Sequence, residues 1–294
     1  MFIVGTDIGG TTFSSVLYDT ALNTIEYSPK ELIANFITTE GLISGICDQI
    51  LDLERKHDLS PDDIMGIGLA CPGPLDALSG MILNTPNLTL LQDIPIVAEM
   101  EKILQSKVYL ENDANLFALG EWVYNSDRKA KVLVSITLGT GVGFGIVLNG
   151  QMYTGAHGMA AEYGISPVGK EQWEDGIAIR GLNKLSVLKF NRICSPKELF
   201  DLASTGDLNA LEIWSVYGAR LGLVLSHVIN MLDPDVITIG GGISHAFPFF
   251  SESMLVEISI HSPAYQFYKT TIIESTEKEK SAMLGAAKLV KINW

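Results

Sequence analysis

Two glycine-rich segments combine the backbone freedom and the polar groups that phosphate binding requires. The segments are Asp7-Ile8-Gly9-Gly10-Thr11-Thr12 and Leu138-Gly139-Thr140-Gly141-Val142-Gly143. Glycine allows close approach of a ligand to backbone N–H groups, and the threonine hydroxyls add donors. Each segment alone is equally compatible with an ordinary polar hairpin turn. Because both occupy equivalent places in two halves of the chain, together they favour a phosphate chain clamped between two domains.

Two carboxylates stand at expected strand ends. Asp7 follows an apolar run and suits a magnesium ion held through water. Asp113, in Glu111-Asn112-Asp113, lies between an expected strand and an expected helix. A carboxylate there suits a general base that takes a proton from a hydroxyl attacking a γ-phosphate. The alternative is that Asp113 only caps the helix beginning at Ala114.

A third glycine segment, Gly240-Gly241-Gly242, follows the apolar run 236–239. A backbone without side chains allows a flat ring such as adenine to lie close to it. A tight turn between a strand and a helix explains the same residues, and for this segment alone that reading is favoured.

The elements that position these residues follow from hydrophobic patterning. Strands are predicted at 2–6, 13–18, 23–27, 64–70, 107–110, 132–138, 144–148, 151–153 and 236–239, and helices at 40–57, 114–122, 208–232 and 281–290. The order strand, glycine turn, strand occurs twice, which predicts two related α/β domains. We expect an N-terminal domain at 1–113, with the closing helix 281–294 as a candidate addition, and a larger C-terminal domain at 114–280.

Composition narrows the function classes. The 294 residues carry a net charge of −14 and no Lys/Arg cluster, so no nucleic-acid partner is expected. The three cysteines, Cys47, Cys71 and Cys194, have neither metal-ligand nor disulfide spacing, which fits a reducing compartment. No signal-like start and no apolar run of about 18 residues is present. We therefore expect a cytoplasmic protein without a membrane span.

The motifs together resemble the ROK family (repressor, open reading frame, kinase). The resemblance is carried by Asp7-Ile8-Gly9-Gly10-Thr11-Thr12, Glu111-Asn112-Asp113-Ala114-Asn115, Leu138-Gly139-Thr140-Gly141-Val142-Gly143 and Gly240-Gly241-Gly242-Ile243-Ser244, in matching order over essentially the whole chain. It implies the α/β, actin-like ATPase fold (ribonuclease H-like, hexokinase-type), with ATP and a sugar in a cleft between two domains. Together with the magnesium ion expected at Asp7, the expected cofactors are ATP and Mg²⁺.

The resemblance further implies sugar ligands on several segments. They are Gly73 in Cys71-Pro72-Gly73-Pro74, Asn87 in Asn84-Thr85-Pro86-Asn87-Leu88, Asn112, Asp113, Glu162 in the segment 155–164, and Glu174 in Trp173-Glu174-Asp175-Gly176. Planar Asn, Asp and Glu groups match the vicinal hydroxyls of a sugar. The nucleotide and its phosphates are expected at Asp7, Gly9, Gly10, Thr11, Thr12, Gly139, Thr140, Gly141, Gly240, Gly241 and Gly242.

The chain departs from the family where a zinc site is usual. Ile165 stands in place of the family's histidine, and no cysteine lies between Cys71 and Cys194. We expect no zinc, and His157 is a poor substitute because it precedes Glu162. The glycine turn at Asp7 leaves no room before it for a DNA-binding domain, which favours the kinase branch.

The expected function is ATP-dependent phosphorylation of a hexose-type sugar, by a glucokinase-like or N-acyl amino sugar kinase, with Asp113 as base. One alternative is a catalytically weak, sugar-binding regulatory protein of the same fold. Another is an actin-like ATPase that uses no sugar. The family resemblance and the frequency of two-fold oligomers favour a homodimer. Which sugar is used, and at which hydroxyl, stays open.

Overall fold

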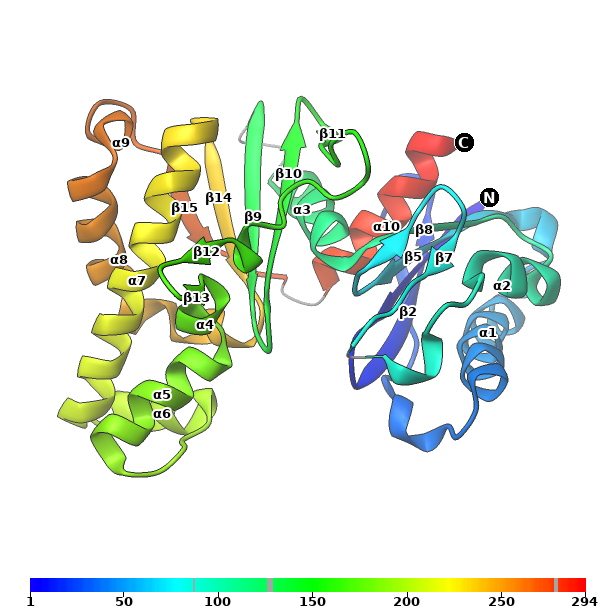
Figure 1. Ribbon diagram of the computed structural model, residues 1–294. Coiled ribbons are helices and arrows are strands. Elements are labelled where there is room, and N and C mark those ends of the chain that lie inside the picture. The colour runs from blue at the N-terminus through cyan, green and yellow to red at the C-terminus, as the bar shows by residue number, and fades with distance from the viewer. Residues whose placement is uncertain (87, 126–128, 278–279) are drawn as a thin grey trace. The chain divides into compact units, whose positions relative to one another are not determined.

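The computed structural model of the chain describes residues 1–86, 88–125, 129–277 and 280–294 (Figure 1). Contacts between Cα atoms divide these residues into two units. Unit 1 takes the described residues of Met1–Ser126, Gly155–Gly158 and Glu279–Trp294, and unit 2 takes those of Asp127–Thr154 and Met159–Lys278. Each unit has its own sheet and its own hydrophobic core.

Unit 1 is built on a six-stranded mixed sheet with the order β3-β2-β1-β5-β8, in which β4 also pairs with β2. Its strands are β1 (Phe2–Ile8), β2 (Thr12–Asp19), β3 (Thr24–Tyr27), β4 (Glu31–Leu32), β5 (Ile64–Cys71) and β8 (Val108–Asn112), and a separate hairpin joins β6 (Leu75–Asp76) to β7 (Met81–Ile82). Strands β1 and β2 are antiparallel, whereas β1, β5 and β8 run parallel.

Helices cover both faces of this sheet (Figure 1). They are α1 (Thr39–Lys56), α2 (Ile96–Leu104), α3 (Asp113–Tyr124) and α10 (Lys280–Asn293). Because successive strand residues point to opposite faces, Val4 packs into the core with α1 and α2, and Ile3 into the core with α10. Thr38 caps α1 by accepting a hydrogen bond from the backbone N–H of Gly41 at 3.1 Å.

The division between the units differs from the expected boundary at residue 113. Helix α3 belongs to unit 1 because it packs along α10. The buried Ser281 hydroxyl of α10 donates to Glu121 Oε1 of α3 at 2.5 Å, which ties the two helices together. The C-terminal helix is therefore part of the N-terminal unit.

Unit 2 is built on a five-stranded sheet with the order β11-β10-β9-β14-β15. Its strands are β9 (Val132–Leu138), β10 (Val142–Leu148), β11 (Gln151–Met152), β14 (Val236–Gly240) and β15 (Thr271–Glu274), with a small hairpin of β12 (Pro167–Val168) and β13 (Glu171–Gln172) apart from it. As in unit 1, an antiparallel pair is followed by strands that add in parallel.

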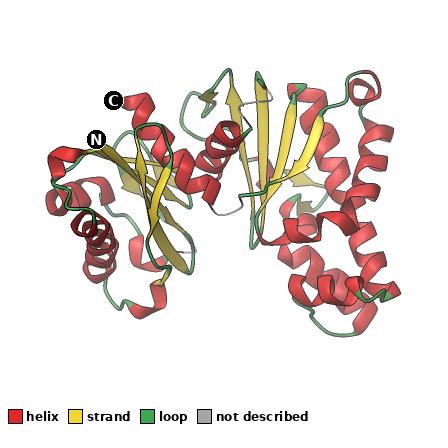
Figure 2. Cartoon of the chain, turned by 180° about the vertical axis from the view of Figure 1, so that it is seen from behind, coloured by secondary structure: helices red, strands yellow, loops and turns green. Residues whose placement is uncertain are grey.

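The helices of unit 2 pack beside this sheet, as the view from behind shows (Figure 2). They are α4 (Glu174–Ile177), α5 (Ile179–Phe190), α6 (Pro196–Ser204), α7 (Leu208–Leu232), α8 (Phe247–His261) and α9 (Pro263–Phe267). Trp214 and Tyr217 of α7 pack on Phe250 of α8 with tilted and edge-on ring contacts, and all three rings are fully buried.

The predicted internal repeat is confirmed at the level of single residues. Both glycine turns join a long antiparallel pair, β1–β2 in one unit and β9–β10 in the other. The sequence of buried, half-buried and exposed positions over 131–142 is identical to that over 1–12. None of the described helices combines the length and the apolar character that a membrane crossing requires.

Candidate functional site

Three neighbouring parallel strands of unit 1 end at the same edge of its sheet. Asp7 pairs with Ala70 across β1 and β5, and Cys71 pairs with Asn112 across β5 and β8. The residues at these ends therefore gather at the edge where ligands commonly bind in α/β sheets. The buried Cys71 thiol is close enough to both aspartates to be affected by their charges. Burial first, and then the charges of Asp113 and Asp7, raise the pKa of this thiol well above the ordinary value.

Asn112, and not Asp113, is the N-cap of helix α3. The Asn112 Oδ1 atom accepts hydrogen bonds from the backbone N–H groups of Ala114 at 3.0 Å and Asn115 at 3.3 Å. Asp113 is the first residue of the helix, and its Oδ1 accepts from the Ala114 N–H at 2.8 Å. The capping role considered for Asp113 is thus filled mainly by its neighbour.

The turn after β5 lies against Asn112. A Cβ atom built on Gly73 would stand 3.3 Å from Asn112 Nδ2. Buried Glu111 links the end of β8 to helix α3. Its Oε1 accepts hydrogen bonds from the Asn112 backbone N–H at 2.8 Å and from Asn115 Nδ2 at 3.1 Å. Unit 1 therefore brings Asp7, Gly73, Asn112 and Asp113 to one sheet edge.

The first glycine turn closes on itself and exposes its middle. The Gly9 N–H donates to the Thr12 carbonyl at 2.9 Å, and the Thr11 carbonyl accepts from the Ile33 N–H at 2.9 Å. Gly10 and Thr11 are exposed. The polar groups at the tip of this turn are therefore the ones placed to meet a ligand.

The second glycine turn, in unit 2, also closes on itself, but over a shorter span than the first. The Gly139 N–H donates to the Gly141 carbonyl at 3.0 Å, which leaves Thr140 and Gly141 exposed at the tip. The Gly139 carbonyl accepts from the Ile179 N–H at 2.9 Å, so the start of α5 is attached to this turn.

The third glycine segment combines a position that only glycine can fill with a position that lines a pocket. Gly241 has a φ of +83°, and a Cβ atom on it would lie 2.4 Å from the Leu138 carbonyl oxygen, so only glycine fits there. Gly242 meets nothing within 4 Å on its Cβ side and lines a pocket of about 460 Å³. The pocket is lined by Pro196, Lys197, Phe200, Asp201, Trp214, Gly242, Ile243, His245, Ala246 and Glu274.

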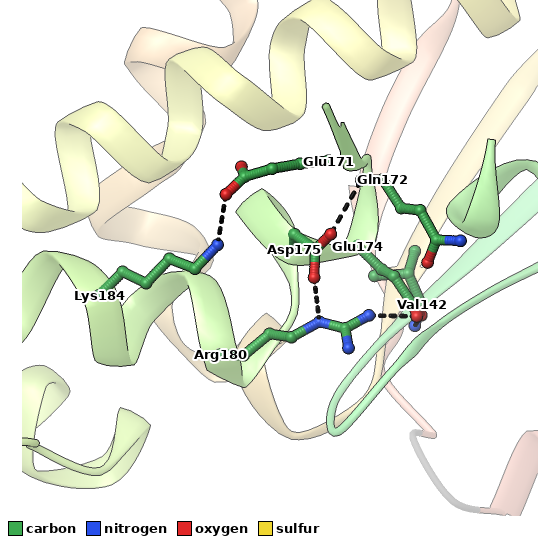
Figure 3. A network of polar contacts seen from close by, with 7 residues as sticks. All are labelled: Val142, Glu171, Gln172, Glu174, Asp175, Arg180 and Lys184. Atoms are coloured by element: carbon green, nitrogen blue, oxygen red, sulfur yellow. Dashed lines mark hydrogen bonds and ion pairs between the residues drawn. The ribbon is translucent and has the colours of Figure 1, made fainter. Parts of the chain in front are cut away.

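The two carboxylates predicted as sugar ligands in unit 2 have different surroundings. Glu162 is exposed at the residue level, yet the protein atoms around its carboxyl, and then the charge of Glu174, raise its pKa. Glu174 pairs closely with Arg180 through Oε1, and its Oε2 accepts from the Val142 N–H at 3.4 Å (Figure 3). Glu174 thus contacts the second glycine turn.

Other expected residues have these outcomes. Asn87 lies outside the described residues. Gly240 is the last residue of β14. Sequence reasoning missed Arg180, Phe200, His245 and Glu274; a signal existed only for Arg180, the sole cation between 171 and 183.

The residues beside the first glycine turn fit a magnesium ion. Within the described ranges, no group of three or more His, Cys, Asp or Glu side chains is arranged to hold a metal. Magnesium is commonly held by one or two carboxylates, water and the phosphates of a substrate, and Asp7 beside the first glycine turn offers such a carboxylate. The expected absence of zinc stays a prediction.

Comparison with known proteins places the chain among sugar kinases and related regulators. The model of the ROK family matches residues 3–293. A glucokinase of Thermotoga maritima is 30% identical, over 98% of this chain and 97% of that protein. A xylose repressor of Bacillus subtilis is 25% identical, over 98% of this chain and 77% of the repressor.

Among solved structures, a ROK hexokinase from Thermus thermophilus superimposes with a TM-score of 0.84 at 26% identity, covering 100% of this chain and 99% of that one. The likeness confirms the predicted fold class, an α/β fold of the actin-like ATPase type.

Proposed function

The chain belongs to the ROK family, and from this membership we propose that it transfers the γ-phosphoryl group of ATP to a hydroxyl of a hexose-type sugar. The glucokinase and hexokinase relatives support a sugar kinase. N-acetyl-D-glucosamine kinases are also similar, one of them at 27% identity, so the proposed substrates include N-acyl amino sugars as well as glucose.

The observation that carries the proposal is the sheet edge of unit 1. Asp7, Gly73 and Asp113 reach it from three adjacent parallel strands. Such an arrangement supplies an acceptor for a hydroxyl proton, amide donors for neighbouring hydroxyls, and a carboxylate for a cation within one unit. A plain hairpin turn or a plain helix cap requires none of these together.

Asp113 is the proposed general base. Its carboxylate takes the proton from the attacking sugar hydroxyl as that oxygen bonds to the γ-phosphorus and the bond to the β,γ-bridging oxygen breaks. Asn112 offers its Nδ2 group to a sugar hydroxyl, because its Oδ1 is engaged by the helix cap. Asp7 would hold Mg²⁺ through water, and the ion neutralises charge on the phosphates when bound.

The nucleotide base is proposed to bind in the pocket beside Gly242. Its wall combines apolar side chains, such as Phe200 and Ile243, with the polar side chains of His245 and Glu274. A flat heteroaromatic ring needs this combination of stacking surface and a few polar partners. The exposed tip of the second glycine turn, in the same unit, is proposed to meet the phosphates.

A second candidate function is supported by the repressor relatives. They match the chain closely enough to suggest that a sugar-binding regulator of the same fold is the main competitor. A regulator needs to bind sugar, but it does not need Asp113 to accept a proton.

The test is ADP release from Mg-ATP in the presence of single sugars. The panel contains glucose, mannose, fructose, allose, N-acetylglucosamine and N-acetylmannosamine. Release stimulated by one of these sugars would support the kinase and identify its substrate class. Sugar binding by calorimetry without any stimulated release would favour the regulator.

A further inference from the structure

The Glu174 carboxylate occupies the space next to the second glycine turn. Its Oε2 accepts from the Val142 N–H at 3.4 Å, and a Cβ atom on Gly141 would lie 3.3 Å from the same oxygen. The carboxylate of Glu174 therefore already occupies the place beside the exposed tip of the turn where another anion could bind (Figure 3). A phosphate that used the same backbone donor would have to displace it.

Arg180 pairs with Glu174 but is oriented by a different residue. Its Nη2 reaches Glu174 Oε1, while its Nε donates to Asp175 Oδ1 at 2.9 Å. Asp175 is itself fixed, since its Oδ2 accepts from the Gln172 N–H at 2.8 Å. The guanidinium group would therefore keep its position beside the turn if Glu174 moved away.

The charge balance around the turn favours such an exchange. Glu174 and Asp175 both contact the one guanidinium group, and Glu162 lies near enough to Glu174 for the two charges to interact. Lys184 offsets this cluster only in part, because its Nζ atom pairs with Glu171 at 2.8 Å while its charge also acts on Asp175. An arriving phosphate is repelled while Glu174 stays, and gains a charge-assisted, planar donor pair once Glu174 has left.

We propose that Glu174 is a displaceable occupant of the nucleotide-phosphate position and that Arg180 is the cation that binds the phosphate after the exchange. The inference rests on the proposed ATP-dependent function and assigns one part of its nucleotide site. The sugar contact expected of Glu174 from the sequence stays a separate prediction, because Glu174 leaves both the turn and Arg180 in the proposed exchange.

The experiment is calorimetric binding of ATP, ADP and adenosine to the wild-type chain and four variants: Arg180→Ala, Arg180→Lys, Glu174→Gln and Lys184→Ala. Arg180→Ala should weaken ATP and ADP binding about 10- to 100-fold, as loss of a charged hydrogen-bond pair does. Adenosine binding should not change, and Arg180→Lys should recover part of the loss.

Glu174→Gln should tighten ATP binding about fivefold, since a competing charge is removed. Lys184→Ala is the matched control and should behave as wild type.

Three results would overturn the inference: unchanged ATP affinity in Arg180→Ala, an equal loss of adenosine affinity in that variant, or unchanged or weaker ATP binding in Glu174→Gln. Each leaves the proposed kinase function standing as long as the wild-type chain binds ATP. A wild-type chain that binds neither ATP nor ADP would instead contradict the proposed function itself.

Discussion

The side-chain amide of Asn112 lies directly against the backbone of Gly73, where a Cβ atom would stand 3.3 Å from Asn112 Nδ2. The two residues belong to adjacent strand ends, and Asn112 is held in place by capping helix α3 with its Oδ1 atom. The amide nitrogen is consequently the part of Asn112 that is directed to the turn, where the sugar is proposed to bind.

Replacing Gly73 with alanine should therefore impair sugar use. The new methyl group would push the Asn112 amide by a few tenths of an ångström, and misplacement of a substrate-positioning group has steep kinetic consequences. We expect the KM for the sugar to rise about tenfold. The KM for ATP and the melting temperature should stay near wild type. An unchanged sugar KM would contradict the placement of Gly73 and Asn112 beside the sugar.

Asp7→Asn should raise the Mg²⁺ concentration needed for half-maximal activity. An amide keeps the shape of the side chain but loses the charge that attracts the hydrated ion. A shift of about tenfold or more is expected, corresponding to loss of one charged interaction. Asp62→Asn, at an exposed position of the same unit, is the control. Identical Mg²⁺ titrations for Asp7→Asn and wild type would remove Asp7 from the metal site.

Phe200→Ala tests the proposal that adenine binds in the pocket beside Gly242 in unit 2. Stacking of a base on an aromatic ring contributes about 1–3 kcal/mol. The KM for ATP should therefore rise about tenfold, with the sugar KM unchanged. Phe267→Ala, at a ring that is 78% exposed and does not line the pocket, should have no effect. Equal ATP kinetics in the two variants would place the base elsewhere.

Glu54 should make the chain less stable as the pH rises. The residue is buried on α1, its Oε1 has no hydrogen-bond partner among the described residues, and desolvation raises its pKa above 4.5. The folded state then binds the proton more tightly than the unfolded state does. The free energy of unfolding therefore falls as the pH rises from about the ordinary pKa of a glutamate through the raised pKa of Glu54.

Glu54→Gln removes this titration. The melting temperature of Glu54→Gln minus that of wild type should be larger at pH 8 than at pH 4. Asp48→Asn, which changes an exposed carboxylate of the same helix, is the control and should show no such trend. A difference between Glu54→Gln and wild type that does not depend on pH would show that the carboxyl titrates normally.

Local patterns were sufficient to predict the elements around both glycine turns. The apolar runs before Gly9 and Gly139 form the expected strands, and helix α7 has the predicted bounds of 208–232. These elements are defined by their own hydrophobic residues and by clear stop signals such as Asp233-Pro234.

The features that were missed depend on distant contacts. Helix α8 carries apolar residues on all sides, so it has no amphipathic period to recognise. The observed division between the units lies after α3 and not at the expected residue 113. The reason is that α3 packs against α10, which is more than 150 residues further along the chain. The pairing of Glu174 with Arg180 likewise depends on the turn between α4 and α5, which no spacing rule predicts.

The central claim, that Asp113 is the base of a sugar kinase, is tested most directly by the turnover of Asp113→Asn with the sugar that stimulates the wild-type chain. The substitution keeps the size of the side chain and an acceptor oxygen for the Ala114 N–H, so folding and ATP binding should be unchanged. We predict that kcat falls about 100- to 10,000-fold, the usual contribution of a general base, while Asp62→Asn turns over as wild type. An Asp113→Asn variant that keeps wild-type kcat would contradict the account.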